Sequence, residues 1–230
     1  ITELIKNKIT NRNAEIKTTP RGSLAVILKS KKSEAKPIAV CCDVDETAFI
    51  VSDITDDGFI KVKKLTDYRI GNICGVDVTV GNENVRIPGV MAGKVLHAAS
   101  KDDREKPSAE KMFVNVGEDN GKKLREKIEK GDFVTYASDF EEFGRDKYTG
   151  KALECRIPAG LMIEAANDLT DPGRTVIFYF NTKAKTGATD LFSLIYTYAP
   201  ETILLLDGIS SSPDKDKRNC RPGKGIIAPA

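Results

Sequence analysis

The sequence predicts an α/β protein that carries a small inserted β-barrel domain. Three observations lead to this fold class. An apolar strand near the N-terminus precedes a β-rich middle, the middle consists of short alternating strands broken by glycines, and continuously apolar strands alternate with helices after residue 150. Apolar strands separated by helices indicate a parallel sheet that is covered on both faces. We expect the α/β domain to comprise residues 1–53 and 150–230, and the inserted barrel residues 54–149.

The elements of the α/β domain follow from local patterns. Apolar residues at helical spacing predict a helix over residues 1–9, and the turn Pro20-Arg21-Gly22 precedes an apolar strand. Pro158 suits the first turn of a helix that runs to about residue 169, and a second helix is expected at about 189–198. The expected strands lie at 23–29, 38–43, 175–180 and 202–207.

The middle of the chain has the pattern of a small barrel or sandwich. The strand 49–51, the turn Asp56-Asp57-Gly58 and the alternating segment 59–63 are typical of a β-hairpin. A helix is expected at 121–130, with Gly131 as its C-cap. Further short strands are expected at 76–80, 85–90, 112–116 and 132–136.

Composition excludes some classes of partner. The 36 basic and 34 acidic side chains nearly cancel, so no long-range field favours nucleic acid or an anionic membrane. No apolar run approaches the ~18 residues that a membrane-spanning helix needs. The cysteines are five in number and scattered without a C-x-x-C motif, which fits a reducing cytoplasm. We therefore expect a soluble cytoplasmic protein that binds neither nucleic acid nor membrane.

Three carboxylates follow the strand 38–43 at its C-terminal end. Asp43 and Asp45 share one face of an extended chain and Glu46 lies on the other. They could form the tip of a hairpin, or a site, because pockets in α/β sheets lie outside the carboxyl ends of strands. Like charges so close together need a cation, a proton or a Lys or Arg partner.

Several segments, in order along the chain, resemble the tetrahedral (TET-type) glutamyl aminopeptidases, a metallopeptidase family also labelled cellulase-like or endoglucanase-like. Residues 38–51 resemble its strand ending in His-x-Asp-Glu, and 150–156 resemble its Gly-Lys-Ala-Leu-Asp-Asp-Arg segment. Residues 87–97 and 112–117 resemble its inserted β-barrel. The resemblance implies an aminopeptidase-type, phosphorylase/hydrolase-like sheet with helices on both faces.

The resemblance also implies a centre of two divalent metals, zinc or cobalt, with a bridging water and a glutamate as general base. The first histidine ligand of the family falls on Asp43, and Asp45 keeps the place of the aspartate that orients that histidine. The bridging aspartate falls on Glu154, and Asp207 matches a ligand aspartate. Three ligand positions of the family site thus carry oxygen donors in this sequence, namely Asp43, Glu154 and Asp207.

The family's Glu-Glu pair, which holds the general base and a ligand, falls on Ala184 and Lys185. Alanine accepts no proton, and a lysine ammonium repels a metal where a carboxylate would bind it. The terminal histidine ligand would lie beyond Ala230. We expect no metal cofactor and no catalytic residue, and at most a weak site for one hard cation on the three oxygen donors. We also expect Lys185 to pair with one of those carboxylates.

Other residues have simpler interpretations. His97, the single histidine, falls in the inserted domain and is expected to be structural. Cys155 has no neighbouring base and is expected to be a buried, inert thiol, while Cys41 and Cys42 fill the core. The loop 208–218 lacks the order of a phosphate-binding loop. Residues 221–227 resemble the family's segment that borders its active site.

These observations predict a non-catalytic aminopeptidase homologue with a structural, regulatory or assembly role. Its partners would be further copies of itself or related subunits. Two alternatives stay open at this point. One is a metal-dependent aminopeptidase whose site is rebuilt from the remaining carboxylates, and the other is a module that binds a peptide or an amino acid in the old pocket.

Overall fold

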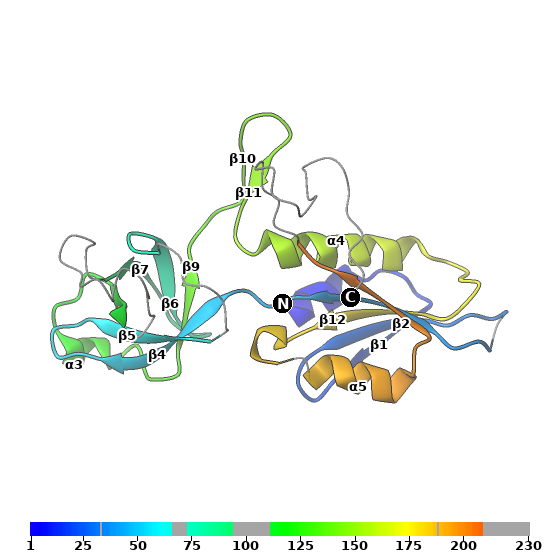
Figure 1. Ribbon diagram of the computed structural model, residues 1–230, viewed down its shortest axis with the longest axis horizontal. Helices are drawn as coiled ribbons and strands as arrows, with labels where there is room; N and C mark the ends of the chain where they lie inside the picture. Colours follow the sequence, from blue (N-terminus) through cyan, green and yellow to red (C-terminus); the bar gives the residue numbers. More distant parts are fainter. Residues whose placement is uncertain (33, 66–72, 94–110, 188, 209–230) are drawn as a thin grey trace, which may run out of the picture. The chain divides into compact units, whose positions relative to one another are not determined.

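The computed structural model describes residues 1–32, 34–65, 73–93, 111–187 and 189–208, which form two compact units (Figure 1). The α/β unit contains 1–44, 153–184 and the described residues from Thr189 on, and the barrel unit contains the described residues of 45–152 together with 185–187. These divisions differ from the expected boundaries at 53/54 and 149/150. The reason is that the strand after the three carboxylates pairs with barrel strands.

The α/β unit is built on a five-stranded sheet with the strand order β1-β2-β12-β3-β13. β3 pairs in parallel with β12 and with β13, whereas β2 is antiparallel to both β1 and β12. The expectation of a parallel sheet is therefore wrong for β2, which runs antiparallel to β12. The short turn after β1 permits only antiparallel pairing of β1 with β2. The strands are β1 (Ala14–Thr18), β2 (Leu24–Leu28), β3 (Ile38–Asp43), β12 (Val176–Asn181) and β13 (Thr202–Leu206).

Helices cover both faces of this sheet, as the sequence predicts. On one face, α1 (Thr2–Lys8) and α4 (Leu153–Asp168) bury side chains against β2, β3 and β12. On the other face, Leu194 of α5 (Thr189–Tyr198) packs against the alternate residues of the same strands. Figure 1 shows α4 and α5 on opposite sides of the sheet. Strand alternation thus gives the unit two separate cores.

α4 begins five residues earlier than expected, at Leu153. Pro158 lies inside the helix, where it has no N–H to donate to the carbonyl of Glu154. The helix nevertheless continues through Pro158, because its buried residues Cys155, Ala159 and Met162 anchor the segments on either side. Tertiary packing overrides the local preference here, and Glu154 becomes part of the first helical turn.

The barrel unit is a closed barrel with the strand order β4-β5-β8-β7-β6-β9. Its pairings are all antiparallel, and its interior is apolar, with Phe49, Ile60, Met91 and Val134 fully buried. The predicted hairpin and the four further predicted strands are present. The strands are β4 (Ala48–Ile54), β5 (Ile60–Lys64), β6 (Asp77–Gly81), β7 (Arg86–Ala92), β8 (Phe113–Asn115) and β9 (Phe133–Tyr136).

The helix expected at 121–130 is only one turn long, α3 (Gly121–Leu124). Arg125, the residue after it, donates hydrogen bonds to the carbonyl of Ile54 and to the Asp56 carboxylate, which ties the chain to the end of β4. Leu124 and Ile128 are still buried, so the spacing of apolar residues predicted the packing but not the helix length.

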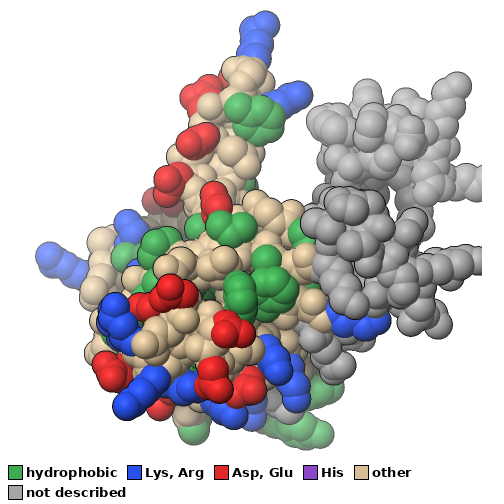
Figure 2. Space-filling view, turned by 90° about the vertical axis from the view of Figure 1, so that its left-hand side faces the viewer, with side chains coloured by type: hydrophobic (Ala, Val, Ile, Leu, Met, Phe, Trp, Pro, Cys, Tyr) green, Lys and Arg blue, Asp and Glu red, His purple; other side chains and the backbone are tan. Residues whose placement is uncertain are grey.

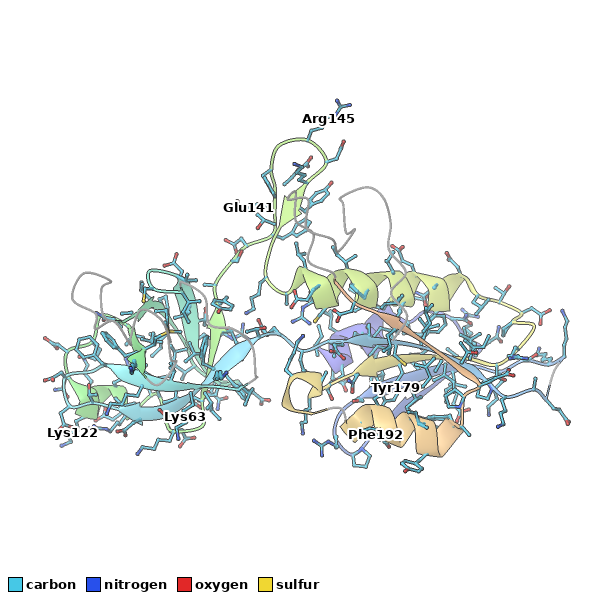
Figure 3. The ribbon with its side chains drawn as sticks, in the orientation of Figure 1. Lys63, Lys122, Glu141, Arg145, Tyr179 and Phe192 are labelled. Atoms are coloured by element: carbon cyan, nitrogen blue, oxygen red, sulfur yellow. The ribbon has the colours of Figure 1, made fainter. Side chains whose placement is uncertain are left out.

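A second, small hairpin was not expected. It is formed by β10 (Glu141–Glu142) and β11 (Tyr148–Thr149), and Figure 3 shows Arg145 near its tip. Figure 2 shows acidic and basic side chains interspersed on the visible surface, in line with the balanced composition. None of the helices in the described ranges has the length and apolar character that crossing a bilayer requires.

Candidate functional site

The three parallel strands all end on the same side of the sheet, and their carboxyl ends carry polar residues. We call this side the sheet edge of the candidate site. Asp43 ends β3, and it lies opposite Asn181, the last residue of β12. Leu206 of β13 lies opposite Cys42, so Asp207 follows at the same edge. This is the edge at which open α/β sheets bind ligands. The structure therefore brings two of the predicted carboxylates to neighbouring strand ends.

The segment with the three carboxylates is not the tip of a hairpin. β3 belongs to the α/β sheet and β4 to the barrel, so residues 44–47 connect the two units. Glu46 has a cationic partner within the barrel unit, because its Oε2 lies 3.0 Å from Nζ of Lys151. Lys151 also donates to Oγ1 of Thr135 at 3.2 Å. An ion pair therefore neutralises the Glu46 charge.

Asn181 is a site residue that the sequence reasoning missed. Its Nδ2 donates to Oδ1 of Asp43 at 3.1 Å, and the residue is 6% exposed. Its Oδ1 is buried without a hydrogen-bond partner among the described residues, which is costly for a polar atom. The signal was a single polar residue at the end of the apolar run Val176-Ile177-Phe178-Tyr179-Phe180.

Glu154 also reaches this edge. It lies in the first turn of α4, and a Cβ built on Gly208 would come within 2.5 Å of the Glu154 Cβ. Gly208 donates its N–H to Oδ1 of the preceding Asp207 at 2.7 Å. The absence of a side chain at position 208 thus allows the start of α4 to lie directly against the end of β13.

A two-metal centre would need more donors than these residues offer. Among the described residues, no three His, Cys, Asp or Glu side chains lie close enough together to hold a metal ion. Oδ1 of Asn181, which lies near Asp43, is a neutral and buried oxygen. The described donor set therefore does not fit the di-metal centre that the sequence resemblance implies.

The thiols near this edge are buried. Cys155 is 1% exposed, Cys41 2% and Cys42 3%. Burial, and secondarily the Asp43 charge, raises the pKa of both Cys41 and Cys42 to about 12. Cys41 and Cys42 are therefore neutral thiols at physiological pH and poor nucleophiles. The burial of all three cysteines agrees with the sequence prediction.

Arg156 holds the end of β3 in place. Its Nη1 donates to the carbonyl oxygen of Val44 at 2.6 Å, so α4 is fastened to the residue that follows Asp43. The sequence reasoning did not single out this side chain. Its position two residues after Glu154, on a helix that packs against β3, was the available signal.

Ala184 and Lys185 lie in a short 3₁₀ helix, residues Ala184–Thr186, just after β12. Lys183 precedes it with a positive φ of 59°, so the chain turns sharply there. Lys185 groups with the barrel unit, as does Asp45, whereas Asp43, Glu154 and Asp207 group with the α/β unit. The expected ion pair of Lys185 stays a prediction. His97, Cys220 and the segment 221–227 lie outside the described residues, as does the loop after Gly208.

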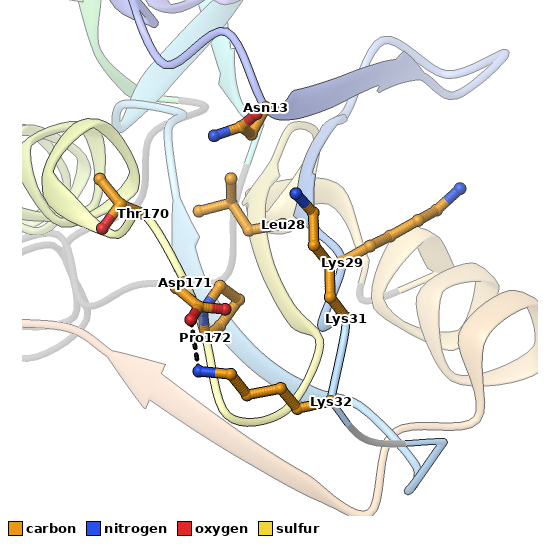
Figure 4. A pocket seen from close by; sticks show the side chains of 8 residues that line it. All are labelled: Asn13, Leu28, Lys29, Lys31, Lys32, Thr170, Asp171 and Pro172. Atoms are coloured by element: carbon orange, nitrogen blue, oxygen red, sulfur yellow. Dashed lines mark hydrogen bonds and ion pairs between the residues drawn. The ribbon is translucent and has the colours of Figure 1, made fainter.

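A pocket of about 200 Å³ lies at the opposite ends of the strands from Asp43, where β2 ends and β12 begins (Figure 4). Three lysines line it, but Lys32 pairs with Asp171 and Lys29 pairs with Glu15 at 2.8 Å. These ion pairs cancel much of the positive charge around the pocket, which is separate from the residues described above.

The α/β sheet, the closed barrel and the polar ends of the parallel strands are those expected of the aminopeptidase family that the sequence resembles. The model of the M42 glutamyl aminopeptidase family matches residues 22–228. The chain belongs to this family, and the sequence resemblance is confirmed.

Relatives and solved structures agree with this assignment. FrvX of Escherichia coli is 25% identical over 187 residues, which are 80% of this chain and 52% of FrvX. A relative from Acetivibrio thermocellus is 22% identical and covers 90% of this chain and 59% of its own length; both have aminopeptidase in their names. This chain thus spans between half and three fifths of the length of these two relatives.

Among solved structures, the aminopeptidase APDkam598 of Desulfurococcus kamchatkensis superposes with a TM-score of 0.86 at 21% identity, over 97% of this chain and 62% of its own. The dodecameric PhTET1, whose peptidase comes from Pyrococcus horikoshii, gives 0.79 at 23% identity, over 93% of this chain and 64% of its own. At these identities the likeness concerns the fold.

Proposed function

We propose that this chain is a non-catalytic member of the M42 family, with a structural or regulatory role in an assembly. The observation that carries the proposal is the pair Ala184-Lys185 at the position of the family's Glu-Glu pair. A methyl group cannot take a proton from water, and an ammonium group cannot replace a metal-binding carboxylate. Both the base and a ligand are therefore lost in one short turn.

The charge of Lys185 has a role in this proposal. The sheet edge carries the carboxylates of Asp43 and Asp207, with Glu154 beside it, and these need a positive counter-charge. In the family a metal would supply that charge. At this position of the sequence Lys185 brings a positive charge where the family has a metal-binding carboxylate, and an ammonium group supplies neither a Lewis acid nor an activated water.

The assembly role is supported by the oligomers that relatives form. The solved structure of PhTET1 is a dodecamer, and this peptidase of Pyrococcus horikoshii can assemble into a tetrahedron or a large octahedral shell. We propose that this chain forms a homo-oligomer or joins related subunits in the cytoplasm. The nearly neutral overall charge is compatible with such close packing of copies.

Hydrolysis assays test the proposal. Purified protein is incubated with a panel of aminoacyl-nitroanilides in the presence of zinc, cobalt or manganese, and the expected result is no release of nitroaniline above the buffer rate. The Lys185→Glu variant restores one carboxylate and should show saturable zinc binding by calorimetry that the parent protein lacks.

Lys183→Glu is the matched control, because it makes the same charge change two residues away on an exposed side chain. Metal-dependent release of nitroaniline by the parent protein would contradict the proposal and favour a rebuilt peptidase. Equal zinc binding and melting temperature in parent protein and Lys185→Glu would contradict the counter-charge role of Lys185.

A further inference from the structure

The loop that carries Ala184 and Lys185 is held at both of its ends by one turn of the α/β unit. We use the name 182–190 loop for the described residues 182–187, 189 and 190. It begins directly after β12 and ends at the second residue of α5. The turn is the β1–β2 connection, residues 19–23. None of these contacts takes part in the candidate site described above.

The C-terminal end of the loop is held by a buried carboxylate. Asp190 is 2% exposed, and its Oδ2 accepts hydrogen bonds from Oγ of Ser23 and, at 3.2 Å, from Oγ1 of Thr19. Nε of Arg21 lies 3.4 Å from its Oδ1 and supplies the counter-charge. A buried carboxylate needs such partners, because an unpaired one would be strongly destabilising.

The N-terminal end of the loop contacts the same turn. The backbone N–H of Thr182 donates to Oγ of Ser23 at 3.0 Å. The Oγ1 hydroxyl of Thr182 donates to the carbonyl of Arg21 at 3.3 Å. The Ser23 hydroxyl therefore accepts from one end of the loop and donates to the other. Ser23 itself is fully buried, so water cannot replace these bonds.

The turn is a rigid anchor for these contacts. The backbone N–H of Ser23 donates to Oγ1 of Thr19 at 3.0 Å, and the N–H of Thr19 donates to the Ser23 carbonyl at 2.8 Å. Buried Tyr179 of β12, which is labelled in Figure 3, donates a hydrogen bond from its hydroxyl to the Asp190 carbonyl at 2.9 Å. A turn closed by its own hydrogen bonds thus bridges strand, loop and helix.

We propose that Asp190, together with Ser23, Thr19 and Arg21, forms a clamp that fastens Thr182 and Asp190, the two ends of the segment that carries Ala184 and Lys185, to the β1–β2 turn. Asp190 is a positioning residue in this scheme, not a ligand. The inference rests on the proposed function in one respect, which is the role that the proposal gives to the charge of Lys185. The clamp itself can be tested without any assay of activity.

Hydrogen exchange measured by mass spectrometry tests the clamp in the full-length protein. In Asp190→Asn, one carboxylate oxygen becomes an NH₂ group that cannot accept a hydrogen bond, so Ser23, Thr19 and Arg21 are left with a single, uncharged acceptor oxygen. The amides of 183–187 should then exchange about tenfold faster, which is the effect of losing about 1.4 kcal/mol of local protection. Peptides from β2 and β12 should keep their parent rates.

A second pair of variants covers the case in which Asp190→Asn fails to fold. Thr19→Val removes one hydroxyl from the half-buried anchor and should raise the same local exchange rate, whereas Thr19→Ser keeps the hydroxyl and should not. Arg174→Ala is the control for a lost ion pair elsewhere in the unit, that with Glu201, and should leave 183–187 unchanged.

Parent-like exchange of 183–187 in both Thr19→Val and any folded Asp190→Asn would overturn the proposal. So would an equal increase across β2, β12 and the loop, because that pattern indicates general destabilisation. A clamp that passes this test while the protein hydrolyses nitroanilides would contradict the proposed function alone.

Discussion

Cys41 and Cys42 are adjacent in sequence but belong to opposite cores of the α/β sheet. Cys42 packs with α1 and α4, and Cys41 packs with α5. Two small apolar side chains at this point let β3 be buried on both faces, as a central strand must be. Their high pKa is a consequence of this burial and not of a catalytic environment.

The thiols predict how stability depends on pH. In the unfolded chain a cysteine ionises near its ordinary pKa of 9.0, whereas Cys41 and Cys42 do so at about 12 in the folded protein. Burial of the neutral thiols therefore favours folding fully below pH 9, and this contribution is lost as the pH rises towards 12. Between these two pH values, each thiol adds up to about 1.4 kcal/mol per pH unit to the decline in the free energy of unfolding.

Urea unfolding under reducing conditions between pH 8 and pH 11 measures this effect. Cys42→Ala should flatten the decline in unfolding free energy, although it lowers the stability at pH 8 because it removes a buried sulfur atom. Cys74→Ala is the matched control, because that cysteine is exposed. An equal slope in the parent protein and Cys42→Ala would contradict the assignment.

At the scale of the element, two glycine turns show how a tertiary contact adds to local geometry. Gly58 in the β4–β5 turn has φ +80°, and a Cβ there would lie 1.9 Å from the carbonyl oxygen of Glu118. Gly144 in the β10–β11 turn has φ +65°, but no atom lies within 4 Å of its would-be Cβ. Of these two glycines, only Gly58 is required both by its positive φ and by the close approach of a neighbouring backbone.

Alanine substitutions distinguish the strain of a positive φ from a steric clash with a neighbouring backbone. Gly144→Ala should cost about 1–2 kcal/mol, the price of a left-handed conformation. Gly58→Ala should cost about 3 kcal/mol or more, because the Glu118 backbone must also move. Chemical denaturation followed by circular dichroism measures both, and equal costs would show that the close approach to Glu118 is relieved easily.

Most strands were predictable because their signal is local. Alternation of apolar residues predicted β5 to β8, and continuous apolar runs predicted β2, β3 and β12. β1 was missed because two of its five residues, Glu15 and Lys17, are charged and the strand lies at a side of the sheet. The length of α3 and the start of α4 were missed because packing, not propensity, decided them.

At the scale of the whole molecule, the two edges of the α/β sheet differ in their protection. β1 carries Glu15 and Lys17, which form an ion pair at 2.9 Å. β13, the strand at the other edge, has no charged residue, and its Leu204 and Leu205 are 53% and 54% exposed. An apolar edge strand without charges is a site of strand-to-strand association.

We therefore expect the purified chain to self-associate through β13 as its concentration rises. Leu204→Lys and Leu205→Lys together should lower the weight-average mass measured by light scattering after gel filtration. Ile16→Lys on β1 is the matched control and should change nothing, because that edge already carries charge. An unchanged mass in the double variant would show that association uses other surfaces.

The sequence by itself determined the fold class and the family, because these depend on residue type and order along the chain. That Ala184 and Lys185 take the places of two carboxylates stays a prediction from the family resemblance. Only the tertiary structure decided that Asn181 lies beside Asp43, that Glu46 pairs with Lys151, and that Asp190 ties the 182–190 loop to a distant turn. Each of these contacts joins segments far apart in sequence, and strand register and burial, which set such contacts, have no local signature.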